Sequence, residues 1–185
     1  MYKRQLLVKF GKVISKIDNN DLLPARLSPK PDSLAAKGIA YGMIKHRVRM
    51  VMLYQFAEIH NLLVVGAANK TEILTGTFTQ WGCDQCADIM PISHLFRSQI
   101  EKLAAYLGVP ETIRIKPADP DILPGVDNKE ALLGPFEIVD QILWGLENGV
   151  DREWLSSHFG ERTVSRVGLL YDKFRFMREI PYCFS

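Results

Sequence analysis

The chain has 185 residues, a length typical of one domain, and 47% of its residues are hydrophobic against 24% charged, which excludes a disordered tail. Lysine and arginine number 23 against 21 acidic residues, so the net charge of +2 argues against nucleic-acid binding through phosphate neutralisation. There is no apolar run of about 18 residues, so a membrane-spanning helix is not expected. Three cysteines do not make a disulfide framework, and a cytoplasmic location is the default expectation.

The first third of the chain is predicted to be mainly helical. An apolar stripe with lysines between its members predicts a helix over residues 5–17, and prolines predict an extended loop over 22–31. The longest helix is predicted from about Ser33 to Asn61. Its apolar positions recur at spacings of three and four: Ile44, Val48, Val51, Met52, Phe56 and Ile59.

Two short apolar segments in the middle of the chain predict strands of a parallel sheet. Residues 62–66 are wholly apolar and partly β-branched, which is typical of a buried strand, and residues 88–92 form the second candidate. Asn69 is expected to cap a helix beginning at Lys70, and Ser93 is expected to cap a helix running to Leu107.

The last third is predicted to consist of a long loop and then helices. Prolines and aspartates over 116–126 predict the loop, and Asp127 has capping-box spacing for a helix start. Helices are expected over 136–147, 151–158 and 162–176. Two strands are too few for a doubly wound sheet, which indicates the carboxyl-terminal portion of an α/β domain.

The segment after the first strand candidate has the pattern of a ligand site. Ligands of open α/β sheets bind beyond the carboxyl ends of the strands, and backbone N–H groups at a helix start favour phosphate. Glu72 lies in the first turn of the predicted helix, where its carboxylate can hold Mg²⁺ or simply complement the helix dipole. The local pattern alone favours the dipole.

Ordered motifs over about three quarters of the chain carry a resemblance to a known family. They are GAANKTEILTG at 66–76, TQWG at 79–82, ADIMPI at 87–92, LFRSQ at 95–99, LAAYLGVP at 103–110, KPAD at 116–119, KHRVRM at 45–50 and FMREIP at 176–181. In this order they closely resemble the ammonia-dependent NAD synthetases of the N-type ATP pyrophosphatase superfamily.

This resemblance implies a fold, an activity and partners. The fold is the Rossmann-like adenine nucleotide alpha hydrolase fold, of which the chain carries the carboxyl-terminal portion of the parallel sheet with flanking helices. The activity is ATP-dependent, Mg²⁺-assisted amidation of deamido-NAD to NAD through an acyl-adenylate. The partners are deamido-NAD, ATP, ammonia and a second copy of the chain in a homodimer, and the apolar residues of the long helix are candidates for the dimer interface. The sequence does not distinguish free ammonia from glutamine as the nitrogen source.

The resemblance also implies roles for individual residues. Glu72 matches the Mg²⁺ carboxylate, Arg47 matches the arginine that contacts deamido-NAD, and Asp88 matches an aspartate on the dinucleotide. Arg97 stands at an ATP-contacting lysine, which keeps the charge but changes its geometry. For Arg47 and Arg97 the alternative is a solvated helix face.

Several matched positions depart from the family pattern. Ala67 replaces a threonine that touches ATP, and Gln80 replaces a dinucleotide-contacting lysine. Asp119 occupies a serine or threonine position near the nucleotide, where its charge repels phosphate unless a metal intervenes. Phe176 and Met177 stand where relatives have a histidine followed by lysine or methionine, near the dinucleotide.

The family's Ser-Gly-Gly-x-Asp-Ser phosphate loop does not occur in this sequence. We therefore expect residues 1–32 to be a truncated or atypical segment and residues 33–185 to be the NAD synthetase-like domain. A fragment of a longer reading frame is expected, with little ATP turnover on its own. The alternative is a non-catalytic dimer partner that retains the dinucleotide-binding surface.

A C-x-x-C motif at Cys83 and Cys86 is not part of the family pattern. Alone it suggests redox or zinc chemistry, but a zinc site needs four ligands, and Cys183, His94 or His46 would have to converge on it. The favoured interpretation is a variant of a loop that is glycine-rich in many relatives.

Overall fold

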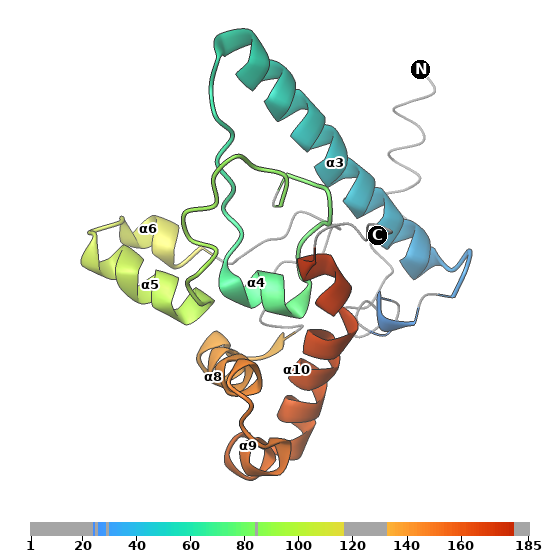
Figure 1. The fold of residues 1–185 in the computed structure, drawn as a ribbon, viewed down its shortest axis with the longest axis vertical. Helices are drawn as coiled ribbons and strands as arrows, with labels where there is room; N and C mark the ends of the chain where they lie inside the picture. The colour runs from blue at the N-terminus through green and yellow to red at the C-terminus, as the bar shows by residue number, and fades with distance from the viewer. Residues whose placement is uncertain (1–23, 25, 29, 84, 117–132, 180–185) are drawn as a thin grey trace, which may run out of the picture.

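The computed structural model describes residues 24, 26–28, 30–83, 85–116 and 133–179. In chain order its helices are α3 (Leu34–His60), α4 (Lys70–Thr75), α5 (Arg97–Tyr106), α6 (Glu111–Arg114), α8 (Phe136–Glu147), α9 (Arg152–Phe159), α10 (Glu161–Lys173) and the 3₁₀ helix η1 (Arg175–Arg178) (Figure 1). The predicted helix at 5–17, the helix start at Asp127 and Asp119 lie outside the described residues, as does Cys183.

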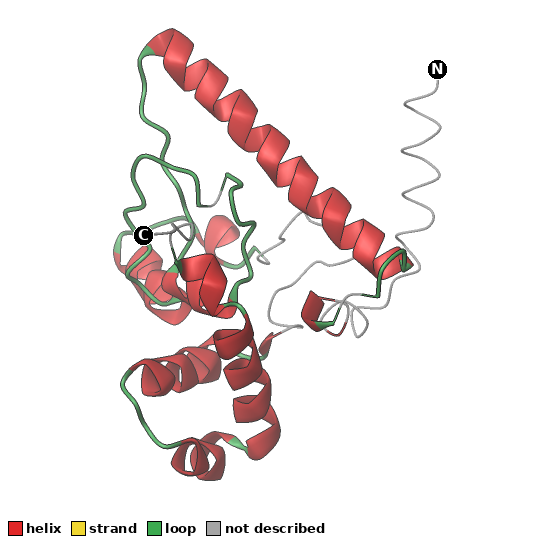
Figure 2. Ribbon diagram, turned by 45° about the vertical axis from the view of Figure 1, so that its right-hand side comes forward, coloured by secondary structure: helices red, strands yellow, loops and turns green. Residues whose placement is uncertain are grey.

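Helix α3 confirms the predicted long helix and both of its ends. Ser33 accepts a hydrogen bond from the backbone N–H of Ala36, and Asn61 ends the helix in the left-handed conformation with φ 52°. The helix extends away from the other helices as a long arm (Figure 2). Among its residues only Gly38, Gly42, His46 and Ala57 are buried.

The two predicted strands are reduced to a single parallel bridge between Val65 and Ile89. The N–H of Gly66 donates to the carbonyl of Ile89 at 2.8 Å, and the N–H of Asp88 donates to the carbonyl of Val64 at 3.0 Å. The parallel pairing was therefore predicted correctly, but no strand forms within the described residues. The expectation of a buried strand at 62–66 is wrong, because the exposed fractions of Leu63 and Val65 are 67% and 62%.

The packed core lies where α8, α9 and α10 meet α4 (Figure 1). Apolar residues of these helices recur every three or four positions, so they fall on one face and turn toward each other. The side chains of Val139, Ile142, Leu143 and Val167 have no exposed surface. This core confirms the predicted helices at 136–147 and 151–158.

Three local predictions are wrong at their boundaries. The helix expected from Ser93 begins only at Arg97, because the Ser93 hydroxyl donates to the carbonyl of Met90 and residues 91–94 form turns. The last predicted helix, 162–176, ends at Lys173 and continues as η1. Within the proline-rich stretch, Pro24, Arg26 and Leu27 are helical rather than extended.

None of the helices in the described part of the chain is both long and apolar enough to cross a lipid bilayer.

Candidate functional site

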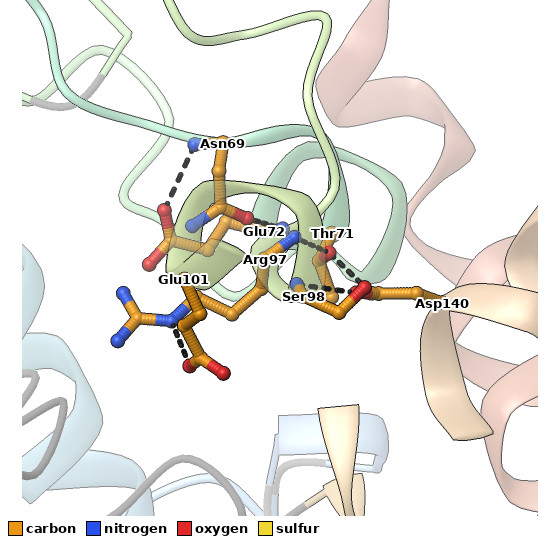
Figure 3. Close-up of polar contacts among 7 residues, drawn as sticks. All are labelled: Asn69, Thr71, Glu72, Arg97, Ser98, Glu101 and Asp140. Atoms are coloured by element: carbon orange, nitrogen blue, oxygen red, sulfur yellow. Dashed lines mark hydrogen bonds and ion pairs between the residues drawn. The ribbon is translucent and has the colours of Figure 1, made fainter. Parts of the chain in front are cut away.

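The start of α4 is fixed by a reciprocal capping box between Asn69 and Glu72. The Asn69 side chain accepts a hydrogen bond from the backbone N–H of Glu72 at 3.0 Å, and the Glu72 carboxylate accepts one from the N–H of Asn69 at 3.1 Å (Figure 3). The helix follows directly on the bridge at Val65, so Glu72 lies beyond the carboxyl end of this segment, as predicted. The helix is six residues long and ends at Gly76, whose φ is 65°.

A buried polar cluster joins α4, α5 and α8 at this point. The Thr71 hydroxyl donates to Asp140 at 2.5 Å and accepts a hydrogen bond from the N–H of Arg97 at 2.9 Å. The second Asp140 oxygen accepts from the N–H of Ser98 at 2.8 Å. Thr71 is 0% and Asp140 is 4% exposed, so these bonds fix the start of α5 against the start of α4 (Figure 3).

This arrangement answers the expectation that backbone N–H groups here favour phosphate. The N–H of Lys70 donates to the carbonyl of Leu95, and those of Glu72, Arg97 and Ser98 donate to side chains. Since these donors are already bonded within the chain, they do not form an open phosphate cradle.

Three predicted nucleotide-site residues surround this cluster. Ala67 is exposed on the segment that leads to α4. Arg97 is partly exposed and its guanidinium pairs with Glu101 at 2.9 Å, one turn along α5 (Figure 3). Glu72 is half-buried and held by its cap, so a cation and a carboxylate lie on neighbouring helix starts.

A second group of predicted residues lies along α3. Arg47 donates from Nε and Nη2 to the backbone carbonyl of Gln80 at 3.3 and 3.2 Å. This forked contact fixes the loop that carries TQWG against the helix. Arg47 and Gln80 were predicted as separate dinucleotide contacts, and the structure brings them together.

Asp88 connects the bridge to α3. Its carboxylate accepts a hydrogen bond from the N–H of Val64 at 2.8 Å and another from the Tyr54 hydroxyl at 3.3 Å. Desolvation and then the Asp88 charge raise the pKa of Tyr54 above its usual value. Asp88, which the resemblance predicts to contact the dinucleotide, is therefore an exposed carboxylate that already accepts two hydrogen bonds.

The closing segment divides its two predicted residues between surface and core. Phe176 is 46% exposed, whereas the Met177 side chain is 4% exposed and packs in the core. The Met177 carbonyl accepts a hydrogen bond from the Gln85 side chain at 3.0 Å. Arg178 next to it donates to the carbonyls of Leu74 and Tyr171, and desolvation lowers its pKa.

The hydrogen bonds therefore place the predicted residues in two groups. Arg97 is linked to the neighbourhood of Glu72 by the hydrogen bond from its N–H to Thr71. Arg47 lies on α3, and Gln80 and Asp88 form hydrogen bonds with residues of that helix. Asp119 is outside the described residues. Sequence reasoning missed Thr71, Asp140 and Tyr54. No local pattern points to Asp140, because its partner Thr71 is 69 residues away in the chain.

The described residues fit Mg²⁺ only in a site with a single protein carboxylate, the kind that nucleotide-binding proteins use. Among the described residues there is no group of three or more histidine, cysteine or acidic side chains able to hold a metal. Mg²⁺ commonly takes one or two carboxylates and completes its shell with water and substrate phosphates. The half-buried Glu72 carboxylate fits that single-ligand role.

The helices and the parallel bridge define a class of fold that solved structures share. An NMN synthetase from Francisella tularensis superposes with a TM-score of 0.62 and 26% identity, over 77% of this chain and 55% of that chain. An NH3-dependent NAD synthetase from Campylobacter jejuni superposes with a TM-score of 0.64 and 24% identity, over 91% of this chain and 64% of that one. The chain thus has part of the fold of these synthetases.

The sequence comparison specifies the family. The NAD synthase family profile matches residues 4–181, and the chain belongs to that family. NH(3)-dependent NAD(+) synthetases of Coprothermobacter proteolyticus and Thermotoga maritima are 40% and 42% identical to it, over 89% and 80% of this chain. These matches cover 56% and 52% of the two relatives, so the chain spans about half of their length.

Proposed function

We propose that the chain is the carboxyl-terminal portion of an ammonia-dependent NAD synthetase, which amidates deamido-NAD to NAD. In this reaction the nicotinate carboxylate attacks the α-phosphate of ATP, and pyrophosphate leaves. Ammonia then attacks the acyl carbon of the acyl-adenylate, and AMP leaves. The observation that carries the proposal is the family match over 4–181, together with the bonded cluster that sets Glu72 and Arg97 on adjoining helix starts.

In the proposed site, the α4–α5 cluster serves the nucleotide. The Arg97 guanidinium is held by Glu101 and balances negative charge on the phosphates. Glu72 would hold Mg²⁺, which when bound neutralises phosphate charge. The cap from Asn69 fixes the Glu72 carboxylate in place, and Asp140 acts through Thr71 and the N–H of Ser98 to position α5.

The group beside α3 serves the dinucleotide in the same proposal. Arg47 offers the cation that pairs with a phosphate or carboxylate of deamido-NAD, and its contact with the Gln80 carbonyl sets the position of its guanidinium. Asp88 offers a carboxylate to hydroxyl groups of the substrate. Phe176 offers an exposed aromatic face, whereas Met177 contributes through its backbone.

Substrate binding tests the proposal on the chain as it stands. Titration calorimetry with deamido-NAD should show saturable binding that Arg47→Ala weakens about tenfold or more, since a charged hydrogen bond contributes about 1.5–3 kcal/mol. The matched control is Arg162→Ala, which removes an exposed arginine from α10 and should leave the affinity unchanged. Absence of deamido-NAD binding by the folded chain contradicts the proposal.

Pyrophosphate release separates the enzyme from its alternative. With deamido-NAD, ATP, Mg²⁺ and ammonium, any release by the chain should disappear in Glu72→Ala and persist in Glu153→Ala, an exposed glutamate of α9. A fragment that lacks the phosphate loop would also bind deamido-NAD without release, so the decisive sample is a fusion that adds the loop-bearing half of a relative. Binding without release by that fusion would favour a non-catalytic subunit that keeps the dinucleotide-binding surface.

We further propose that a second copy of the chain covers α3. Large apolar side chains of this helix are exposed by 48% to 70% (Ile44, Val48, Val51, Met52, Leu53, Phe56 and Ile59). So large an apolar surface on one helix is typical of an interface, and a two-fold dimer buries the same face of both copies.

The oligomeric state of a surface variant tests this interface. Sedimentation velocity over a concentration series should show a dimer that Phe56→Glu dissociates, because the charge would be buried in the interface. Tyr106→Glu changes an aromatic side chain of α5 that is 87% exposed and should leave the dimer intact. A folded chain that stays monomeric at high micromolar concentration contradicts the dimer.

A further inference from the structure

The C-x-x-C motif, which the family pattern does not explain, lies against α3 in the structure. Nδ1 of His46 is 3.3 Å from Sγ of Cys83. His46 is 7% exposed, so its ring is held in place, while Cys83 and Cys86 are both partly exposed thiols. A ring nitrogen at this distance can accept the thiol proton, and the thiolate is the reactive form of cysteine.

The backbone around the motif places both cysteines in one short turn. The N–H of Cys86 donates to the carbonyl of Gly82 at 2.9 Å, a hydrogen bond with the i to i−4 spacing of a helical turn. Residues three apart in such a turn have Cβ atoms about 5–6 Å apart on one face. A disulfide needs a Cβ separation of about 3.5–4.5 Å, so a small tightening of this turn suffices.

The same turn is tied to the two sides of the proposed dinucleotide site. Gln85 accepts a hydrogen bond from the N–H of Trp81 and donates to the Met177 carbonyl. Trp81 adopts a φ of 60°, which is unfavourable for a side chain of this size, and Gln80 before it accepts the two bonds from Arg47. Tightening the turn therefore has to move backbone that these contacts hold.

We propose that Cys83 and Cys86 form a reversible thiol–disulfide pair in which Cys83 is the attacking thiol and His46 its base. This inference stands apart from the proposed synthetase activity. It needs no metal, in agreement with the lack of a cluster of three metal-ligating side chains in the described part of the chain. The oxidant is a hydroperoxide, for which hydrogen peroxide is the probe.

The reaction balances in two steps. His46 takes the proton of the Cys83 thiol, and the thiolate attacks one peroxide oxygen; the O–O bond breaks, and the leaving hydroxide takes a proton to become water. Cys83 is then a sulfenic acid. The Cys86 thiol attacks this sulfur, the S–S bond forms, the S–O bond breaks and a second water leaves. Two thiols are oxidised and one peroxide is reduced.

Peptide mapping tests the pair in a Cys183→Ser background, which leaves two cysteines in the chain. The reduced protein is treated with hydrogen peroxide and then alkylated with N-ethylmaleimide. We expect the mass of the peptides spanning Cys83 and Cys86 to fall by two hydrogen atoms, with no alkylation of either sulfur. Disulfides only between two chains, or oxidation without a bridge, would overturn the proposal.

Single variants assign the roles. In Cys86→Ser, dimedone should trap a sulfenic acid on Cys83, and this should form about tenfold faster or more than oxidation of Cys86 in Cys83→Ser. His46→Gln should slow oxidation of Cys83 by about tenfold or more. His60→Gln is the matched control, since it lies on the same helix about 21 Å away and should leave the rate unchanged.

These comparisons remain decisive if the buried position 46 does not tolerate glutamine. The Cys83→Ser and Cys86→Ser proteins then decide by themselves, and equal reactivity of the two thiols overturns the assignment. Tryptophan emission supplies a readout of the loop: it should change on oxidation of the parent protein, and the change should disappear in Trp81→Phe. An emission change that persists in Trp81→Phe would contradict movement of this turn.

Discussion

Two regions of the molecule carry similar numbers of apolar side chains but bury them to different extents. In α8, α9 and α10 most apolar side chains pack in the core, as Val139 and Leu143 show with 0% exposure, and only Trp144, Trp154 and Leu169 are about half exposed. In α3 and the segment at 62–65 many apolar side chains are exposed instead, and Val51, Leu63 and Val65 are each at least 60% exposed. The first region is stabilised from within the chain, whereas the apolar surface of the second is suited to contact with other surfaces.

A matched pair of leucines gives the largest expected difference between the regions. Leu143→Ala removes a side chain with no exposed surface and should lower the free energy of unfolding by about 2–5 kcal/mol. Leu63→Ala makes the same change at a side chain that is 67% exposed and should cost less than about 0.5 kcal/mol. Urea denaturation measures both, and equal losses would show that residue 63 is covered in solution.

A pair of glycines sharpens the comparison at the edge of the packed region. Gly76 has φ 65°, and a Cβ there would overlap the side chain of Phe174, so Gly76→Ala combines backbone strain with a clash. We expect a loss of roughly 2–4 kcal/mol. Gly149 has φ 71° and open space around it, so Gly149→Ala should cost only about 1–2 kcal/mol. Thermal unfolding measures the loss of stability in both variants, and a larger loss in Gly149→Ala than in Gly76→Ala would contradict this expectation.

A pair of aspartates tests the buried polar cluster that joins α4, α5 and α8. Asp140 is 4% exposed and accepts two hydrogen bonds, so Asp140→Asn should cost about 1–3 kcal/mol. The Asp172 side chain is 55% exposed in its pair with Arg152, so Asp172→Asn should cost less than about 1 kcal/mol. Amide hydrogen exchange should show faster exchange at the start of α5 in Asp140→Asn alone. Unchanged exchange there would contradict the positioning role of Asp140.

The smallest effect concerns Tyr54 in the less covered region. Its pKa is raised above the usual value of 10.0, so the neutral phenol is the form that the folded state stabilises. This stabilisation is fully present below pH 10 and is lost as the pH rises through the raised folded-state pKa. Ultraviolet titration should show one late-titrating tyrosine that is missing in Tyr54→Phe. A titration unchanged by that substitution would contradict the raised pKa.

The difference between the regions also explains which parts of the fold could be predicted. The bounds of α8 and the caps at Ser33, Asn61 and Asn69 follow from local patterns, because caps and amphipathic faces depend on residues three or four apart. The prediction of buried strands was wrong because an apolar run was taken to mean burial, and burial depends on neighbours that lie elsewhere in the chain. The start of α5 was predicted too early. The backbone N–H of Phe96, just before the helix, donates to the Gln99 side chain, whereas the Ser93 hydroxyl donates to the Met90 carbonyl and does not cap the helix.

The candidate site could be predicted only in part, for a similar reason. The resemblance proposes Glu72, Arg97, Arg47, Gln80 and Asp88 as site residues by their position in the motifs, and these roles stay predictions. It did not identify the contacts that hold them, such as the hydrogen bonds from Arg47 to the Gln80 carbonyl or from Thr71 to Asp140. These join residues 33 and 69 positions apart, and nothing in a short sequence window records such a pairing.

The reciprocal cap at the start of α4 has a consequence for the affinity of the candidate site. A glutamate side chain on a surface loses up to about 1.5–2 kcal/mol of rotamer entropy when a ligand immobilises it. At Glu72 the hydrogen bond from Asn69 restricts these rotamers as soon as the helix folds. A ligand that arrives later meets a carboxylate whose direction is already set, so more of its contact energy appears as affinity.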